Sequence, residues 1–223
     1  MKYLPCLLYI AGMTTIARSR RATSQRKGDR NEQMILKTAE RLLTDSPLAD
    51  VTVEALARGA GISRSSFYFY FGSKEDVLLS LLDRLVGEID AAIGALDRTI
   101  AEDPIASVRA AIESSARVWR DHGPVLHAVI EAAGSHDAVR EAWHATMRRF
   151  VDAIAATIRA ERARGAAPET GPSPEQLAST LVWANERLFQ LSSLREASAL
   201  TGDEIVPVLA EVWYRAIYAR PSG

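Results

Sequence analysis

Apolar residues at helical spacing recur along almost the whole chain, and this periodicity limits the fold more than any other feature of the sequence. The first clear case follows Asn31, where apolar positions recur three and four residues apart until Pro47, which a helix interior does not accept. No segment alternates apolar and polar residues over four or more positions between turn residues, as a half-buried strand would. The chain is therefore predicted to be all-α.

Capping residues, prolines and glycines divide the chain into about nine predicted helices. Ser73 can cap a long helix, and Asp103 precedes a proline at the first position of the next one. The sequence His122-Gly123-Pro124 is predicted to break that second helix. The other predicted helices include Thr52–Ala60, Ser63–Phe71, Asp137–Arg164 and two opened by capping-box patterns at Ser173–Gln176 and Thr201–Glu204.

The charges are divided unevenly along the chain. Residues 1–75 carry twelve basic and seven acidic residues, whereas residues 76–223 carry fifteen basic and twenty-one acidic residues. This division indicates that the first third of the chain faces a polyanion. Within it, Ala17–Arg30 has six basic residues and one acid, which is typical either of a solvated tail or of an arm that contacts nucleic-acid phosphates.

Residues 1–28 are expected to form a disordered tail that includes this basic arm. The first twelve residues place a lysine before an apolar run, as a secretory signal does, but the run is short and contains Pro5. We therefore favour a start at Met13, which would leave residues 1–12 untranslated; if they are translated, they are expected to belong to the disordered tail. The single cysteine, Cys6, excludes a disulfide framework and a cysteine-rich zinc site.

The segment Val51–Asp76 has the spacing of a helix-turn-helix. Gly61 can adopt a left-handed turn conformation between two short helices, and Ser63 can cap the second of them. In this motif the second helix lies in the major groove of DNA, and small polar residues at its start suit contact with bases. An ordinary corner between two helices is the alternative. The side chains expected to pack inward are Phe67, Phe69 and Phe71, with the hydroxyls of Tyr68 and Tyr70 exposed.

The complete motif resembles that of the TetR family of one-component transcriptional regulators. The residues that carry the resemblance are Thr52, Ala57, Gly61-Ile62-Ser63, Tyr68-Phe69-Tyr70-Phe71 and Lys74-Glu75. Longer strings, among them PLADVTVEALARGAGIS and AERARGAAP, resemble the ethionamide-resistance repressors of actinobacteria within this family. The resemblance implies a ligand-responsive regulator, most simply a repressor, that binds a palindromic double-stranded DNA operator as a homodimer and leaves it when a small hydrophobic effector binds.

The resemblance also implies which residues contact DNA. An arginine can bind guanine O6 and N7 together, whereas hydroxyls and a lysine suit phosphate oxygens. The alternatives are a purely structural role for Tyr70 and a solvent-exposed one for Arg64. The implied DNA-binding residues are Thr52, Arg64, Ser65, Ser66, Tyr68, Tyr70 and Lys74.

Two domains are expected, a helix-turn-helix DNA-binding domain over residues 29–75 and a ligand-binding and dimerisation domain over residues 76–223. The last two helices carry long apolar stripes, the final one through Ile205, Val208, Leu209, Val212, Trp213, Ala216 and Ile217. In the family these two helices pair with those of a second copy. Packing within one chain is the alternative, and it accounts for half of each stripe in any case.

Asn185 interrupts an apolar helix face, where an amide without a partner costs about 1–3 kcal/mol. It is therefore either one end of a structural hydrogen bond or a polar group inside an apolar cavity. The resemblance favours the cavity, in which Asn185 would orient a hydrophobic amide, ester, ketone or acyl-chain compound. The implied ligand-binding residues are Trp119, Trp143, Met147, Phe150, Asn185, Glu186, Phe189 and Trp213.

The sequence offers little support for catalysis. The four histidines lack metal-ligand spacing, the serine pairs lack the glycines of a nucleophile elbow, and there is no glycine-rich phosphate loop. We therefore expect no enzyme activity, no cofactor and no metal. No apolar run approaches the roughly 18 residues of a membrane span, so a cytoplasmic, nucleoid-associated protein is expected. The alternatives are an effector-free or architectural DNA-binding protein and a helical ligand carrier or enzyme.

Overall fold

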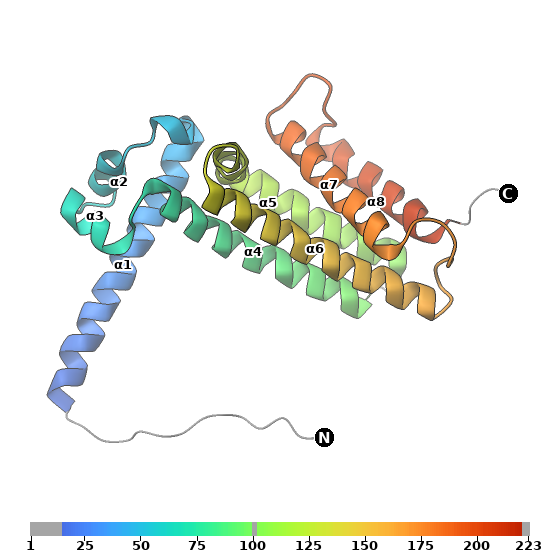
Figure 1. Cartoon of the computed structure of the whole chain (residues 1–223), viewed down its shortest axis with the longest axis horizontal. Helices are drawn as coiled ribbons and strands as arrows, with labels where there is room; N and C mark the ends of the chain where they lie inside the picture. Colours follow the sequence, from blue (N-terminus) through green and yellow to red (C-terminus); the bar gives the residue numbers. More distant parts are fainter. Residues whose placement is uncertain (1–14, 100–101, 220–223) are drawn as a thin grey trace.

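Helices make up the whole of the regular structure in the part of the chain that is described. A computed structural model describes the backbone of residues 15–99 and 102–219 and the side chains of residues 29–87 and 102–219. These residues contain no strand, and the predicted all-α fold is confirmed. The elements in Figure 1 are α1 (Thr15–Asp45), a short 3-10 helix (Leu48–Asp50), α2 (Val53–Gly59), α3 (Arg64–Tyr70), α4 (Lys74–Thr99), α5 (Pro104–Ala133), α6 (Asp137–Ala163), α7 (Pro174–Ser193) and α8 (Gly202–Tyr218).

In the N-terminal head, α2 packs against both α1 and α3, and α1 in turn packs against α4 (Figure 1). Phe67 on α3 is completely buried there, together with Ile35 on α1 and Leu56 on α2. The turn between α2 and α3 depends on Gly61, whose φ of +70° lies in the left-handed region that other residues rarely adopt. The helix-turn-helix expected from the sequence is therefore present.

The first helix begins earlier than the sequence analysis expects. Since α1 starts at Thr15, it includes residues 15–28, which were expected to belong to a disordered tail. Between Thr15 and Lys27 there is neither proline nor glycine, so the local sequence allows the helix to extend back from the head. Residues 1–14, with Cys6 and the alternative start at Met13, lie outside the described residues.

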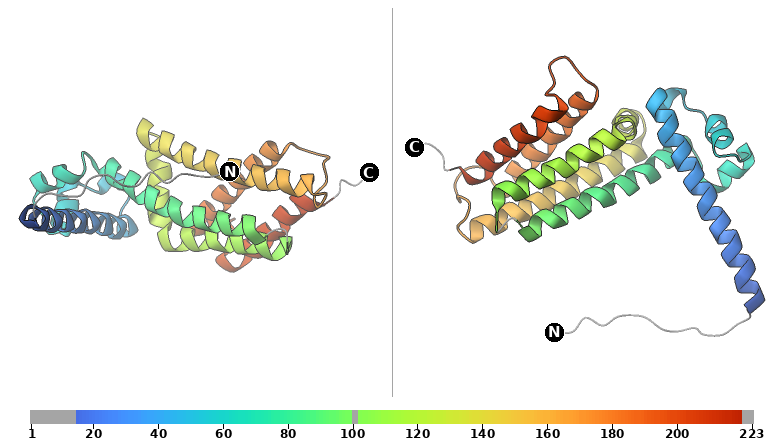
Figure 2. Two further views of the ribbon diagram at one scale, coloured as in Figure 1. Left: turned by 90° about the horizontal axis from the view of Figure 1, so that it is seen from below. Right: turned by 180° about the vertical axis from the view of Figure 1, so that it is seen from behind.

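The helices α4 to α8 form a bundle in which α5 packs against all the others (Figure 2). The helix α4 leaves the head and continues along the bundle, so one rigid element belongs to both parts of the molecule (Figure 1). At the far end, the buried carboxylate of Glu161 on α6 accepts a hydrogen bond from the Tyr218 hydroxyl at 2.8 Å, which fixes the end of α8. None of the described helices is long and apolar enough to span a membrane.

The predicted break at His122-Gly123-Pro124 is a kink instead. The helix α5 runs through this site, with His122 at φ −127° and ψ 15° and with Pro124 inside the helix. Proline removes one backbone hydrogen bond and displaces the preceding turn, which bends a helix without necessarily ending it. Trp119 before the kink and Leu126 after it are both buried, so packing holds the two halves in one helix. The described residues therefore form eight α-helices rather than nine.

Candidate DNA-binding surface and ligand cavity

The exposed face of α3 is held in place by a cap at its first turn. The Ser63 hydroxyl accepts a hydrogen bond from the backbone N–H of Ser66 at 3.1 Å and lies 2.9 Å from the hydroxyls of both Ser65 and Ser66. Thr52 caps α2 in the same way, accepting from the Ala55 N–H at 3.1 Å. The hydroxyls of Thr52, Ser65 and Ser66, which were predicted to contact DNA, therefore belong to local capping networks or lie beside them.

The three phenylalanines of α3 do not all pack inward, as was expected. Phe67 and Phe71 are buried, but Phe69 is 82% exposed. Two residues along a helix correspond to a rotation of about 200°, so Phe69 lies on the face opposite Phe67 and Phe71. The structure thus adds a large apolar side chain to the exposed surface of α3, which the sequence analysis missed. Helical periodicity applied strictly to Phe67 would have found it.

Arg64 and Tyr68 lie one helical turn apart on the exposed surface of α3. Arg64 Nη2 donates to the Tyr68 hydroxyl at 3.4 Å, and the guanidinium carbon lies 5.8 Å from the centre of the tyrosine ring. This hydrogen bond raises the pKa of Arg64, which keeps the side chain charged. A charged guanidinium supported by an aromatic ring is well suited to contact with a base or a phosphate.

Tyr70 and Lys74 have partners within the protein. The Tyr70 hydroxyl accepts from Asn31 Nδ2 on α1 at 3.1 Å. Lys74 Nζ donates to the backbone carbonyls of Leu48, Ala49 and Val51 at 2.6, 3.1 and 3.0 Å. Because an ammonium group has three N–H donors, these three bonds use all of them. The structure thus ties Lys74 to the segment before α2, in an arrangement that leaves no donor for a phosphate.

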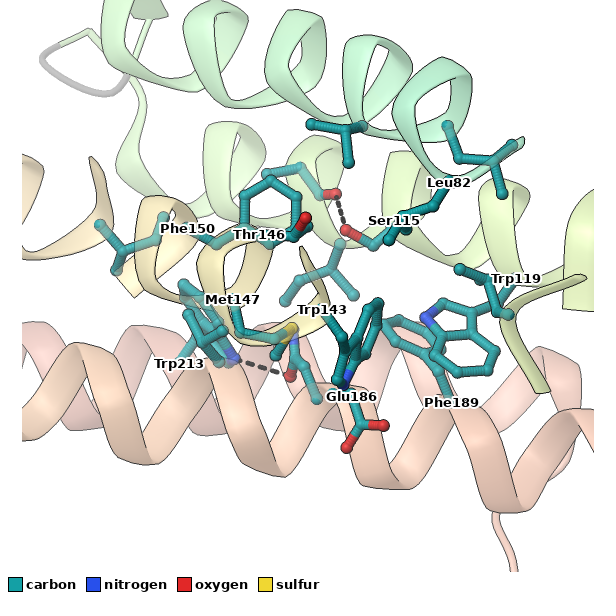
Figure 3. Close-up of a pocket in the computed structure, with 18 residues that line it drawn as sticks. Leu82, Ser115, Trp119, Trp143, Thr146, Met147, Phe150, Glu186, Phe189 and Trp213 are labelled. Carbon is teal, nitrogen blue, oxygen red and sulfur yellow. Dashed lines mark hydrogen bonds between the residues drawn. The ribbon is translucent and has the colours of Figure 1, made fainter. Parts of the chain in front are cut away.

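A cavity of about 100 Å³ lies inside the bundle between α4, α5, α6, α7 and α8. All eight predicted ligand-binding residues line it, and Figure 3 shows Trp119 and Phe189 at one end with Trp213 and Phe150 towards the other. The sequence analysis missed the contribution of α4, which carries Leu82, Leu85 and Val86 into the wall. These residues recur along α4 at the spacing of ordinary core residues, so the sequence contained no separate signal for a role in the cavity.

Polar groups are few in the cavity wall. The Asn185 side-chain oxygen accepts from Trp213 Nε1 at 2.9 Å, a bond drawn as a dashed line in Figure 3. Both interpretations of Asn185 therefore hold together, because it makes a structural hydrogen bond and also lines the cavity. Burial raises the pKa of the neighbouring Glu186 carboxyl, with Arg187 acting in the opposite direction.

The apolar stripe of α8 divides into two faces. Ile205, Leu209 and Trp213 are buried within the chain, whereas Val208 and Val212 are 43% and 49% exposed. On α7 the fourth tryptophan, Trp183, is also exposed and does not line the cavity. The exposed apolar side chains of the last two helices are therefore free to contact another molecule. Among the described residues, no group of three or more histidine, cysteine or acidic side chains could hold a metal ion.

Comparisons with known proteins agree with this architecture. The family model for bacterial regulatory proteins of the tetR family matches residues 35–81, and that for the C-terminal domain of the transcriptional regulator EthR matches residues 108–219. The chain is 41% identical over 222 residues to the HTH-type transcriptional regulator EthR of Mycobacterium tuberculosis, covering 93% of this chain and 96% of that protein. With the EthR of Mycolicibacterium smegmatis it shares 38% identity over 210 residues, with coverages of 92% and 96%.

Among solved structures, the fold is similar to that of NalD, the secondary repressor of the MexAB-OprM multidrug efflux pump in Pseudomonas aeruginosa. The TM-score is 0.71 at 17% identity, and the match covers 86% of this chain and 98% of that one. At this level of identity the similarity concerns the fold alone.

Proposed function

The chain belongs to the TetR family of bacterial transcriptional regulators, and we propose that it is a repressor that a small hydrophobic effector releases from its operator. It is a helix-turn-helix DNA-binding regulator and not an enzyme. We further propose that it acts as a homodimer, at the nucleoid in the cytoplasm.

The double role of α4 is the observation that supports the sensing of an effector. This helix begins at Lys74, directly after the DNA-reading segment, and its residues Leu82, Leu85 and Val86 line the cavity. A ligand that displaces these side chains therefore moves the helix that supports α3. Because interiors are closely packed, such a displacement is transmitted as a shift of a whole element rather than absorbed locally.

On DNA, α3 lies in the major groove with Arg64 towards a guanine edge and Tyr68 towards a phosphate. The exposed ring of Phe69 supplies an apolar surface that suits a thymine methyl group. A single α3 reads few base pairs, so two copies bind half-sites of a palindrome. The exposed residues Val208 and Val212 on α8, with Trp183 on α7, form the contact between the copies.

Release requires that the effector binds the conformation with low DNA affinity more tightly than the other one. Inverting a population of 99:1 takes a preference of about 10⁴-fold. An apolar molecule meets this condition when the cavity is larger in the low-affinity conformation, because additional apolar surface is then removed from water.

The test is footprinting of the full chain on DNA flanking its own gene, followed by titration with hydrophobic amides and esters. We expect protection of a palindromic site at physiological salt and loss of that protection with at least one compound. An effector-free or architectural DNA-binding protein would instead protect DNA in every titration, and binding without sequence preference would contradict the regulator itself.

A further inference from the structure

The cavity described above is too small to hold a whole effector. Ligand sites for drug-sized molecules enclose about 300–1,000 Å³, and an engineered protein cavity of about 150 Å³ accommodates benzene. The inner chamber, as we call the cavity of about 100 Å³, is smaller than that and has room for only a small apolar group. An effector of ordinary size must therefore extend beyond it.

A second cavity begins at the end of the inner chamber. This outer chamber has a volume of about 790 Å³ and lies between the kinked part of α5, the end of α7 and the segment that leads to α8. Trp119 and Phe189 line both chambers. Their rings are stacked at 21° with centres 6.5 Å apart, and Figure 3 shows them together at one end of the inner chamber. The partition therefore includes two side chains, and a change of rotamer of either ring can join the two spaces.

The outer chamber lies beside the kink in α5. Gly123 faces Ser193 on α7, and a Cβ atom at Gly123 would lie 3.6 Å from the Ser193 Cβ. The helices approach closely at this point, and beyond it the α7–α8 segment turns away at Arg195, which has a positive φ of 54°. The chamber lies on the far side of the partition from Asn185 and Trp213.

The charged groups of the outer chamber are balanced. Arg120 and Arg195 line it together with Glu196 and Asp203. A head group with a net charge would be attracted by one pair and repelled by the other, and it would also lose hydration. An uncharged head group with both donors and acceptors avoids these costs.

His127 supplies an acceptor beside the partition. The Ser193 hydroxyl lies 2.8 Å from the Gln190 carbonyl and 2.7 Å from His127 Nε2, and the tautomer that satisfies both contacts has Nε2–H donating to Ser193 while Ser193 donates to Gln190. Burial lowers the pKa of His127, which favours the neutral ring, and Nδ1 then carries a lone pair. No partner for this nitrogen exists among the described residues, although His127 lines the outer chamber and its ring lies 5.8 Å from that of Trp119.

We propose that the two chambers form one site for an elongated molecule, with an apolar end in the inner chamber and an uncharged, hydrogen-bonding head group in the outer one. The His127 Nδ1 atom accepts a hydrogen bond from the head group, and the chain of the ligand passes between Trp119 and Phe189. This inference rests on the proposed sensing function and specifies the chemistry of its effector.

The first test is calorimetric titration of the full chain with three eight-carbon probes, namely octanamide, octanoate and octylammonium. We expect octanamide to bind at least about fivefold more tightly than either charged probe, since only its head group is uncharged. Equal or tighter binding of octanoate or octylammonium would overturn the assignment of the head group, and so would an unchanged preference for octanamide in His127→Phe.

The second test fills the outer chamber. Ala197 lines it, whereas the adjacent Ser198, which is also exposed, does not. We expect Ala197→Trp to weaken octanamide binding about tenfold and to leave the binding of xenon, a smaller probe for the inner chamber, unchanged. The matched control Ser198→Trp should bind both probes as the native chain does. The two-chamber site is wrong if Ala197→Trp binds octanamide like this control, or if its binding of xenon falls to the same extent.

Operator release, measured by gel shift with the same probes, separates the two proposals. Octanamide binding that follows the expected pattern without release would contradict the sensing function and support the two-chamber site. Release by octanamide that Ala197→Trp does not alter would contradict the two-chamber site and support sensing.

Discussion

Trp213 on α8 donates its indole N–H to the side-chain oxygen of Asn185 on α7, at 2.9 Å, inside the wall of the inner chamber. The two residues are 28 positions apart, so the bond joins two helices. It uses one of the two lone pairs of the Asn185 oxygen and fixes the orientation of this side chain in the chamber wall.

The Asn185–Trp213 bond should appear as a coupling between the two side chains. Asn185→Ala leaves a buried indole N–H unpaired, so we expect a loss of about 1–3 kcal/mol in the free energy of unfolding. In a double-mutant cycle with Trp213→Phe, measured by urea unfolding, the two changes should couple by about 0.5–1.5 kcal/mol. Purely additive effects would show that the bond does not contribute. Operator affinity should stay at its native value in Asn185→Ala.

Dimerisation should depend on residues that the single chain leaves exposed. Val208→Asp with Val212→Asp places charges on the outer face of α8, and we expect a folded monomer in light scattering with little remaining operator binding. Leu209→Asp is the contrasting variant, because Leu209 is 2% exposed and a carboxylate there should unfold the chain. A double variant that remains dimeric would place the interface elsewhere.

Phe69 should matter for DNA and hardly at all for folding. Because its ring is 82% exposed, Phe69→Ala should change the free energy of unfolding by no more than about 0.5 kcal/mol. Operator affinity in a gel shift should nevertheless fall. Phe67→Ala, two residues away in the core, should instead cost about 3–5 kcal/mol of stability. Native operator affinity in Phe69→Ala would exclude a role for this ring.

Lys74 should contribute to stability, because its three donors are all used within the protein. Replacing it with methionine removes three hydrogen bonds to the segment Leu48–Val51. A bond from a charged donor is worth about 1.5–3 kcal/mol, and each kcal/mol corresponds to about 2–4 °C for a chain of this size. A clear decrease in Tm is therefore expected. If Lys74 only contacted phosphates, Tm would not change and only the salt dependence of DNA binding would decrease.

Glu186 should make stability depend on pH. Burial raises its pKa, so the folded chain holds this proton to a higher pH than the unfolded chain does. The carboxylate therefore destabilises the fold above the unfolded pKa of about 4.5, and this cost disappears as the pH falls below that value. Glu186→Gln should stabilise the protein at pH 7 and have little effect near pH 4. The exposed Glu196→Gln serves as the control for thermal unfolding, and an equal gain in that variant would rule out burial as the cause.

Much of the local structure could be predicted because its signals act within one or two helical turns. Ser63 and Ser73 cap the helices that follow them, since each hydroxyl accepts from an N–H three residues ahead. Gly61 permits a backbone conformation that most other residues resist. The residues that line the inner chamber were also predicted, through the resemblance of the sequence to known regulators. Their roles in binding remain predictions.

Most of the helices, the helix-turn-helix and the apolar character of the cavity wall follow from local sequence, because propensity, capping and apolar periodicity depend on neighbours along the chain. The tertiary fold decided which apolar residues of α8 are covered: Val208 and Val212 are exposed although they belong to the same apolar stripe as buried residues. Packing also explains why α5 continues through Pro124, and the fold brings Lys74 to three backbone carbonyls. These outcomes depend on contacts between distant residues, and such contacts exist only once the helices have packed.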